Sequence, residues 1–445
     1  MKRTIFRATA AAMAVLAPVT ATTLVAPAAQ AADAVALLEV KATSVTYQNG
    51  AGEDVTYTDY TGATPNQPAT KTQWRSIIQD YNRAGYDNVR EVWAWSEAMQ
   101  RNIPLVLIQP LAKEKRTNAP TLYLMNGADG GEGRANWLAQ TDVIEFWGGN
   151  EGKRPDQKKS RNNPNGPLTS PGIGANIVIP MAGAFSYYTD WNSEVPALQG
   201  DGQGPQKWET FMTKELPAAM EGFQQNGATI ASDVKAVAGM SMTGTTSLLY
   251  AEHNPGMYNA VGSFSGCAET ISPMGSTFVN VTLNRGGANI DQMWGGLNTD
   301  TARYNDALLN AEKLRGQQNV YVSNGTGLAG RHDLPSSPRV NGNLSASGQV
   351  IVEGGIIEGA TNACTHNLAN HTNQLGINTI NYNFRPQGTH QWGYWQDDTR
   401  DFWNDLVTGL GTGAVQPDSA NDPYHYVNGG SGSSADLPDF APLSN

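Results

Sequence analysis

One segment in the middle of the chain constrains the fold most. There an apolar run is followed directly by a serine flanked by glycines, and a helical pattern begins immediately after it. Residues 234–238 (VKAVA) are typical of a buried strand, and residues 243–252 of a helix. Between them stands Gly239-Met240-Ser241-Met242-Thr243-Gly244. This order is typical of a nucleophile elbow, which presents a reactive Ser241 hydroxyl at the edge of a parallel sheet. The usual spacing is Gly-x-Ser-x-Gly, and an ordinary N-cap serine is the alternative.

Short apolar runs bounded by Gly, Pro or Asn predict the other strands. They are residues 103–108, 121–125, 176–180, 260–265, 319–322 and 379–384. Helical patterns precede and separate these runs, at residues 72–84, 208–225 and 243–252. Strand–helix alternation indicates a mostly parallel central sheet flanked by helices. Together with the elbow, it predicts an α/β-hydrolase fold.

We expect four parts along the chain. Lys2, Arg3 and Arg7 precede an apolar run that ends in a small-x-small pattern at Ala31, which predicts a signal peptide over residues 1–31 and a secreted protein of the cell envelope. A membrane anchor is the alternative. An N-terminal extension over 32–100, a catalytic domain over 101–415 and a flexible tail over 416–445 would follow. The polar stretches 149–174 and 325–348 are expected to be surface insertions.

Charge and motifs exclude several classes of function. The net charge is −11, and the sequence lacks the basic face that nucleic-acid binding requires, so we expect no nucleic-acid partner. It contains no HExxH, CxxC, GxxxxGK[ST] or strand-linked GxGxxG motif, so we expect neither a metal nor a cofactor. We also expect a monomer.

A catalytic serine needs an acid and a base, and in this fold the chain order is Ser, acid, His. All six histidines follow Ser241, and His390 lies just after the last predicted strand, where the fold delivers its histidine. The acid should follow the penultimate strand, where Asp333, Glu353 and Glu358 are candidates. Their spacing alone does not separate Glu353 from Glu358.

An oxyanion hole needs two backbone N–H donors. One would come from Met242, directly after the nucleophile, and the other from Ala128, after the strand at 121–125. Cys267 and Cys364 lie near these segments of the sequence. Export would place them in an oxidising compartment, where a disulfide can persist. A bridge and two free thiols remain alternatives.

Several islands resemble one family, the antigen-85-type mycolyltransferases. They include Gly239-Met240-Ser241-Met242, Ser263-Phe264-Ser265-Gly266 and Gly388-Thr389-His390-Gln391-Trp392, and the resemblance covers roughly residues 103–411. It implies transfer of a mycolyl chain from trehalose monomycolate to trehalose, arabinogalactan or another envelope hydroxyl. It also implies Glu358, which precedes Gly359, as the acid of the triad.

The sequence departs from the family at the loop that helps to hold trehalose. Where the family typically has Asp-Gly-Leu-Arg, this chain has Asn126-Gly127-Ala128-Asp129. We therefore expect Asn126 and Asp129 to bind substrate with altered charge. Aromatic residues can stack on sugar rings, and Trp392, with Trp395 and Trp191 as further candidates, is expected to do so, a place in the core being the alternative.

The expected partners are a glycolipid donor and a sugar or envelope acceptor, reached by peripheral contact with the envelope. A secreted carboxylesterase of lipid or wall esters is the alternative. A non-catalytic wall-binding protein is disfavoured by the intact Ser, Glu and His.

Overall fold

The computed structural model describes residues 37–62, 73–151, 168–195, 198, 204–418 and 421–422. These residues belong to one compact unit. The predicted signal peptide, residues 1–31, lies outside them.

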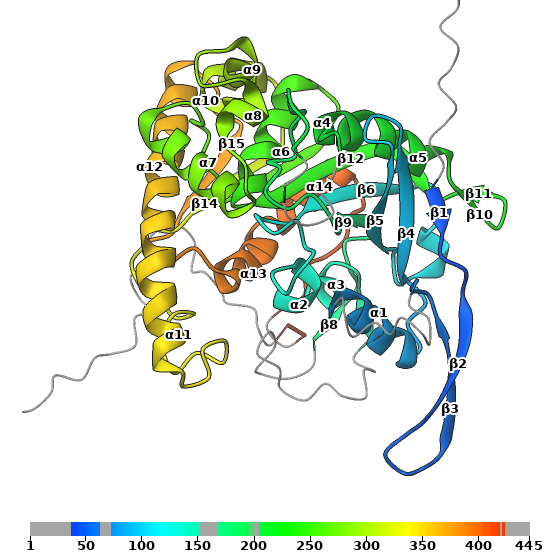
Figure 1. The fold of residues 1–445 in the computed structure, drawn as a ribbon. Coiled ribbons are helices and arrows are strands. Elements are labelled where there is room, and N and C mark those ends of the chain that lie inside the picture. The colour runs from blue at the N-terminus through cyan, green and yellow to red at the C-terminus, as the bar shows by residue number, and fades with distance from the viewer. Residues whose placement is uncertain are drawn as a thin grey trace, which may run out of the picture. The chain divides into compact units, whose positions relative to one another are not determined.

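A nine-stranded sheet forms the centre of the described part, in the order β1-β4-β5-β9-β6-β12-β13-β14-β15 (Figure 1). All pairings from β9 to β15 are parallel, whereas β1–β4, β4–β5 and β5–β9 are antiparallel. The seven predicted strands are confirmed. The strands of the sheet are β1 (Leu37–Glu39), β4 (Val89–Ser96), β5 (Arg101–Ile108), β6 (Ala119–Met125), β9 (Asn176–Pro180), β12 (Ala231–Met240), β13 (Ala260–Phe264), β14 (Val320–Asn324) and β15 (Ile380–Phe384).

Helices cover both faces of this sheet (Figure 1). The helices of the described part are α1 (Gln73–Arg83), α2 (Trp137–Gln140), α3 (Val143–Phe146), α4 (Trp208–Thr210), α5 (Leu216–Gly222), α6 (Met242–His253), α7 (Pro273–Arg285), α8 (Ile290–Trp294), α9 (Asp300–Tyr304), α10 (Ala307–Asn310), α11 (Leu344–Gln349), α12 (Gly355–Gln374), α13 (Trp392–Asp401) and α14 (Trp403–Leu410). Single turns are η2 (Lys113–Lys115), η3 (Phe211–Glu215), η4 (Ala311–Leu314) and η5 (Val350–Gly354). Small ribbons pair β2 (Thr43–Gln48) with β3 (Asp54–Asp59), β7 (Asn150–Glu151) with β8 (Thr169–Ser170), and β10 (Gln224–Gln225) with β11 (Ala228–Thr229).

The middle of the sheet is apolar on both faces because the central strands alternate their side chains between two cores. On β6, Tyr123 and Met125 join the core that contains α6, whereas Leu122 and Leu124 join the core that contains α14. Burial on both faces explains why these strands are nearly continuous apolar runs. None of the helices in the described part has the length and apolar character needed to cross a membrane.

The segment predicted as an N-terminal extension contributes strands to the sheet. β4 pairs with β5 along its whole length, and β1 adds to the outer side of β4. The boundary expected at residue 100 therefore falls in the turn between two paired strands, which places residues 89–96 within the sheet.

The first predicted insertion and the predicted tail both lie partly outside the described residues. Residues 152–167 lie outside the described residues, and the flanking β7 and β8 pair with each other. The start of the predicted flexible tail is packed, because Asp422 is fully buried and its Oδ2 lies 3.1 Å from Nε of Arg400 on α13. Residues 423–445 lie outside the described residues.

One buried carboxyl on α6 has a consequence for stability. Glu252 is fully buried, and neither of its side-chain oxygens has a hydrogen-bond partner in the described part of the chain. Burial raises the pKa of Glu252 well above its usual value, and nearby Lys313 offsets this only in part. Because the pKa of Glu252 is higher in the folded than in the unfolded protein, the free energy of unfolding is highest below the unfolded pKa, where the carboxyl is protonated in both states. It falls as the pH rises from the unfolded towards the folded pKa.

We expect Glu252→Gln to be more stable than the wild type at pH 7 and equally stable near pH 4. The reason is that glutamine carries no charge that burial can penalise. Urea unfolding at both pH values measures the difference. Glu312→Gln is the matched control, since the Glu312 side chain is 74% exposed and its stability should not change. A Glu252→Gln variant with the wild-type pH dependence would contradict the prediction.

Candidate active site

The turn between β12 and α6 holds Ser241 in a strained conformation. β12 ends at Met240, α6 begins at Met242, and Ser241 has φ 58° and ψ −123°. Such angles are costly for a residue with a side chain and are found mainly at functional sites. The N–H of Ser241 donates to the carbonyl oxygen of Phe264 at 2.8 Å, which fixes the turn against β13.

Two glycines make this turn sterically feasible. A Cβ at Gly239 would lie 2.5 Å from the carbonyl oxygen of Thr243, and one at Gly244 would lie 2.7 Å from that of Phe264. The hydroxyl of Thr243 lies 3.1 Å from both the backbone nitrogen and the backbone oxygen of Met240. The helix therefore comes too close to β12 at Gly239 and to β13 at Gly244 for a side chain at either position, while Thr243, where a glycine is usual, uses its hydroxyl to hold the turn.

Ser241, His390 and Glu358 form a continuous hydrogen-bonded chain. Nε2 of His390 lies 2.7 Å from Oγ of Ser241, and its Nδ1 lies 2.8 Å from Oε2 of Glu358. The N–H of His390 donates to the carbonyl oxygen of Gly354 at 3.0 Å, which anchors the loop between β15 and α13. This geometry allows the imidazole to accept the hydroxyl proton while the carboxylate holds its other nitrogen.

Glu358 is the acid candidate that the structure brings to His390. It is fully buried in the first turn of α12, and its Oε1 accepts from the N–H of Gly325 at 2.7 Å and from the hydroxyl of Ser265 at 2.9 Å. Glu353 instead contacts Gln349 at the surface. Asp333 contacts residues beside His390 and not its ring.

The two expected oxyanion donors lie in the same pocket as Ser241. Met242 is the first residue of α6, so its N–H has no acceptor within the helix. Ala128 follows β6, and its carbonyl oxygen accepts from the N–H of Phe185 at 2.7 Å. A Cβ at Gly127 would lie 2.8 Å from Sδ of Met240, so the loop packs directly against the elbow.

The pocket at Ser241 has a volume of about 340 Å³ and is lined mainly by apolar side chains from α7, α12 and α13. Asp129 and Trp392, two expected substrate-binding residues, line it together with Arg285. Burial raises the pKa of Asp129, although backbone N–H groups and Arg285 oppose the shift.

Asn126 is not part of this lining. Its side chain is fully buried, donates to the carbonyl oxygen of Pro180 at 2.9 Å and accepts from the N–H of Trp137 at 3.1 Å. Asn126 therefore holds the loop from beneath, and the structure does not bring it to a substrate. The interpretation of Asn126 as a substrate-binding residue is corrected accordingly.

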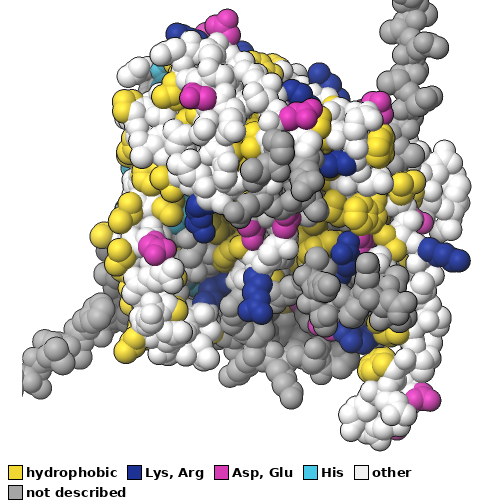
Figure 2. All heavy atoms as spheres, viewed as in Figure 1, with side chains coloured by type: hydrophobic (Ala, Val, Ile, Leu, Met, Phe, Trp, Pro, Cys, Tyr) yellow, Lys and Arg dark blue, Asp and Glu magenta, His cyan; other side chains and the backbone are white. Residues whose placement is uncertain are grey.

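Exposed apolar side chains flank the pocket on the N-terminal part of α12 and the turn before it. Val352 and Ile356 are 60% and 63% exposed, and the adjacent Ile357 lines the pocket. Figure 2 shows hydrophobic side chains along the edge on which α12 lies in Figure 1, with few charges among them. The pocket is thus approached beside an apolar surface.

A disulfide supports the acid-bearing helix. Cys267 and Cys364 are bonded, which ties the loop after β13 to α12. Cys267 itself lines the pocket, and Ser265, two residues earlier, donates to Glu358. The bridge therefore links the two elements that hold the acid.

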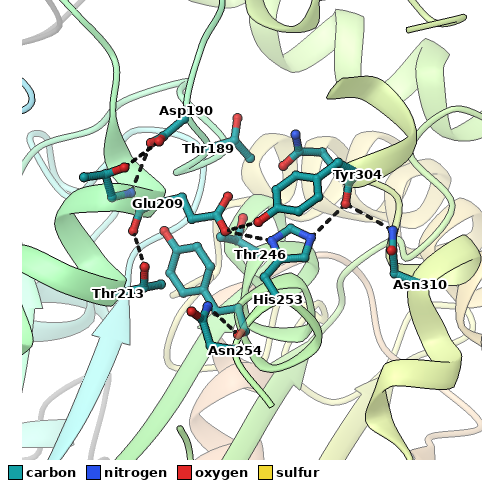
Figure 3. A network of polar contacts seen from close by, with 12 residues as sticks. Thr189, Asp190, Glu209, Thr213, Thr246, His253, Asn254, Tyr304 and Asn310 are labelled. Carbon is teal, nitrogen blue, oxygen red and sulfur yellow. Dashed lines mark hydrogen bonds and ion pairs between the residues drawn. The ribbon is translucent and has the colours of Figure 1, made fainter. Parts of the chain in front are cut away.

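A second, polar pocket of about 660 Å³ lies at the other end of α6. Figure 3 shows that His253, Glu209 and Tyr304 converge there. Oε1 of Glu209 lies 2.8 Å from Nδ1 of His253 and accepts from the hydroxyl of Tyr304 at 2.9 Å, while Nε2 of His253 lies 2.8 Å from the carbonyl oxygen of Tyr304. These groups satisfy one another, so the network fastens α4, α6 and α9 and anchors the C-terminal end of the nucleophile's helix.

The polar residues at strand ends were not identified as part of the site from the sequence. Ser265 follows β13 and Asn324 ends β14, and both donate to Glu358. Their position in the sequence, at the carboxyl ends of predicted parallel strands, could have indicated this role, because such sheets bind ligands at that edge. In the described part of the chain, no group of three or more His, Cys, Asp or Glu is arranged to hold a metal ion.

Comparison with known proteins places this geometry in a family. Residues 172–401 match the family described as "Putative esterase", which is more than half of the chain. The chain belongs to this esterase family. It is therefore an enzyme of the serine hydrolase and acyltransferase type.

Individual relatives confirm the resemblance drawn from the motifs. The diacylglycerol acyltransferase/mycolyltransferase Ag85A of Mycobacterium leprae is 27% identical over 300 residues, which cover 66% of this chain and 76% of that protein. Ag85A of Mycobacterium tuberculosis strain H37Rv is 28% identical over 298 residues, covering 66% and 75%. The crystal structure of MPT51 (FbpC1) from Mycobacterium tuberculosis matches with a TM-score of 0.52 at 19% identity, covering 72% of this chain and 98% of that one. The α/β-hydrolase fold is thereby confirmed.

Proposed function

We propose that this esterase-family protein is an exported acyltransferase. It moves a mycolyl chain from trehalose monomycolate to trehalose, arabinogalactan or another hydroxyl of the cell envelope. The observation that carries the proposal is the hydrogen-bonded chain from Ser241 through His390 to Glu358, next to an apolar pocket. The names of the relatives, which are mycolyltransferases, support the choice of acyl group.

The first half of the reaction acylates Ser241. Nε2 of His390 takes the hydroxyl proton as Oγ attacks the ester carbonyl, and Glu358 stabilises the imidazolium that forms. The N–H groups of Met242 and Ala128 bind the oxyanion. When the tetrahedral intermediate collapses, the C–O bond to trehalose breaks, and His390 returns its proton to the departing sugar oxygen.

The second half transfers the acyl group. An acceptor hydroxyl enters where trehalose left, and His390 removes its proton as the hydroxyl oxygen attacks the acyl-enzyme. A second tetrahedral intermediate then releases Oγ of Ser241, which regains its proton from His390. Asp129 and Trp392 line the pocket beside Ser241, so they are suited to bind and stack on the sugar.

A secreted carboxylesterase is the second candidate. The family description favours it, and so does the acidic Asp129 where mycolyltransferases typically carry an arginine for trehalose. Hydrolysis uses the same acyl-enzyme and differs only in that water takes the place of the acceptor hydroxyl.

A paired assay separates the candidates. Purified protein is incubated with trehalose monomycolate, with and without added trehalose or arabinogalactan, for the wild type and Ser241→Ala. Diacyl trehalose or acylated arabinogalactan that depends on Ser241 is the expected product. Free acid alone, with a yield insensitive to every acceptor, would establish the esterase instead. Turnover that does not depend on Ser241 would overturn both candidates.

A further inference from the structure

The segment 325–348, expected to be a surface insertion, contains a buried carboxylate close to His390. Asp333 is fully buried and accepts four hydrogen bonds. Its Oδ1 accepts from the hydroxyl of Thr389 at 2.6 Å and the amide of Gln391 at 3.0 Å. Its Oδ2 accepts from the N–H of Gly330 at 2.8 Å and the hydroxyl of Tyr394 at 2.7 Å. The acceptor capacity of this carboxylate is therefore fully used.

Three of these four donors surround His390 in the chain. Thr389 and Gln391 are its immediate neighbours, and Tyr394 lies in the first turn of α13. Burial first, and then the Asp333 carboxylate, raise the pKa of Tyr394, so its hydroxyl stays protonated and donates. The Asp333 carboxylate thus binds the residues on both sides of His390, the residue that must lie between Ser241 and Glu358.

The loop of Asp333 is itself locked against α13. Nε2 of His332 lies 3.0 Å from Oδ2 of Asp397, and Nη2 of Arg331 lies 2.6 Å from the same oxygen. A Cβ at Gly393 would lie 2.4 Å from Cγ of His332, so the imidazole rests directly on the helix backbone. The backbone oxygen of Asp333 accepts from the hydroxyl of Ser347 on α11 at 2.7 Å. Asp333 is therefore a fixed point from which the His390 loop is held.

We propose that Asp333 is a positioning residue for the reaction, which holds residues 389–391 so that the His390 imidazole bridges Ser241 and Glu358. The inference rests on the proposed function, in that it assumes His390 to be the general base. The role of Asp333 is distinct from that of the acid, because its oxygens bond to the neighbours of His390 and not to the ring.

The geometry predicts how the substitution Asp333→Asn would act. If the new side-chain amide keeps its oxygen towards the fixed N–H of Gly330, its NH₂ group faces Thr389 and Gln391. The amide of Gln391 would then have to rotate to present its oxygen. That oxygen now accepts from the N–H of Gly393 and caps α13, so the cap would be lost. Asp333→Asn therefore loosens the His390 loop without removing a catalytic group.

The test compares Asp333→Asn with the wild type on a p-nitrophenyl ester, which needs no sugar acceptor. We expect kcat per folded molecule to fall by about 10²-fold, as for a misplaced catalytic group, with KM changed by less than about threefold. Thr389→Val should change kcat in the same direction, and Thr389→Ser, which keeps the hydroxyl, should restore it.

Asn343→Ala is the matched structural control. Asn343 caps α11 in the same segment by accepting from the N–H of Ala346, and it does not contact the His390 loop. We expect this variant to lose stability and keep the wild-type kcat and KM. If Asp333→Asn behaves like Asn343→Ala, the positioning role is overturned while the proposed function stands. If wild-type turnover does not depend on Ser241, the proposed function itself fails.

Discussion

Ser241→Ala is expected to lower kcat for both ester cleavage and acyl transfer by about 10⁴- to 10⁶-fold, with binding of substrate nearly unchanged. Serine-hydrolase triads lose activity on this scale when the nucleophile is removed, because the histidine and the acid of the triad act only through the serine. The residual rate would come from the oxyanion donors and from binding. The measurement is single-turnover release of p-nitrophenol, together with product analysis on trehalose monomycolate.

Ser241→Gly provides a control that tests the elbow itself. Serine and alanine both carry a Cβ at φ 58° and ψ −123°, a conformation that costs about 1–3 kcal/mol and that glycine adopts without strain. We expect both variants to be inactive, with Ser241→Gly more stable than Ser241→Ala by about 1 kcal/mol in urea unfolding. Activity in either variant, or equal stability of the two, would contradict this account of the turn.

Most parts of the fold that the sequence predicted share one physical property. The predicted strands in the middle of the sheet are buried on both faces and therefore read as apolar runs between turn residues, whereas β15, at the edge, has no buried residue and is the exception. The nucleophile was recognised for a related reason, since the close packing at Gly239 and Gly244 excludes larger residues. Where burial or backbone geometry restricts the residue type, a local pattern carries the information.

β4 shows where this reasoning fails. Its sequence VREVWAWS includes Glu91, which is buried in the structure, so the segment does not look like a core strand. The carboxylate is accommodated by Arg75 on α1, at 2.6 Å, and by the N–H of Gly62 at 2.7 Å. Since both partners lie at least 16 residues away in the chain, no local pattern predicted the burial.

The same limit applies to the site. Ser241 and His390 follow from their places at the ends of predicted strands, but the choice of Glu358 over Glu353 needed the family resemblance. Asp333 lies in a polar stretch that is typical of a surface loop, yet its burial depends on Thr389 and Gln391, 56 and 58 residues further along. Asn126 was misjudged because its importance to the loop is structural and its side chain points to the backbone beneath.

Glu358→Gln is expected to lower kcat by about 10⁴-fold while leaving the fold intact. Oε1 accepts from the fixed N–H of Gly325, and the glutamine oxygen can take over that place. The glutamine NH₂ would then face Nδ1 of His390 and donate to it, where the carboxylate had accepted. His390 would be held in the tautomer that carries its proton on Nε2, the nitrogen that must accept the proton of Ser241.

The test measures kcat across the pH range for Glu358→Gln and for Glu353→Gln, its matched control on the preceding turn. Glu353 is exposed and its carboxylate accepts from the surface amide of Gln349, so its variant should match the wild type. The deficit of Glu358→Gln should persist at every pH, because a wrong tautomer is not corrected by titration. Acyl transfer and ester cleavage should fall together, since both require the same acyl-enzyme. A Glu358→Gln variant within about tenfold of the wild type, beside an inactive Glu353→Gln, would assign the acid to Glu353 and overturn the hydrogen-bonded chain as the source of catalysis.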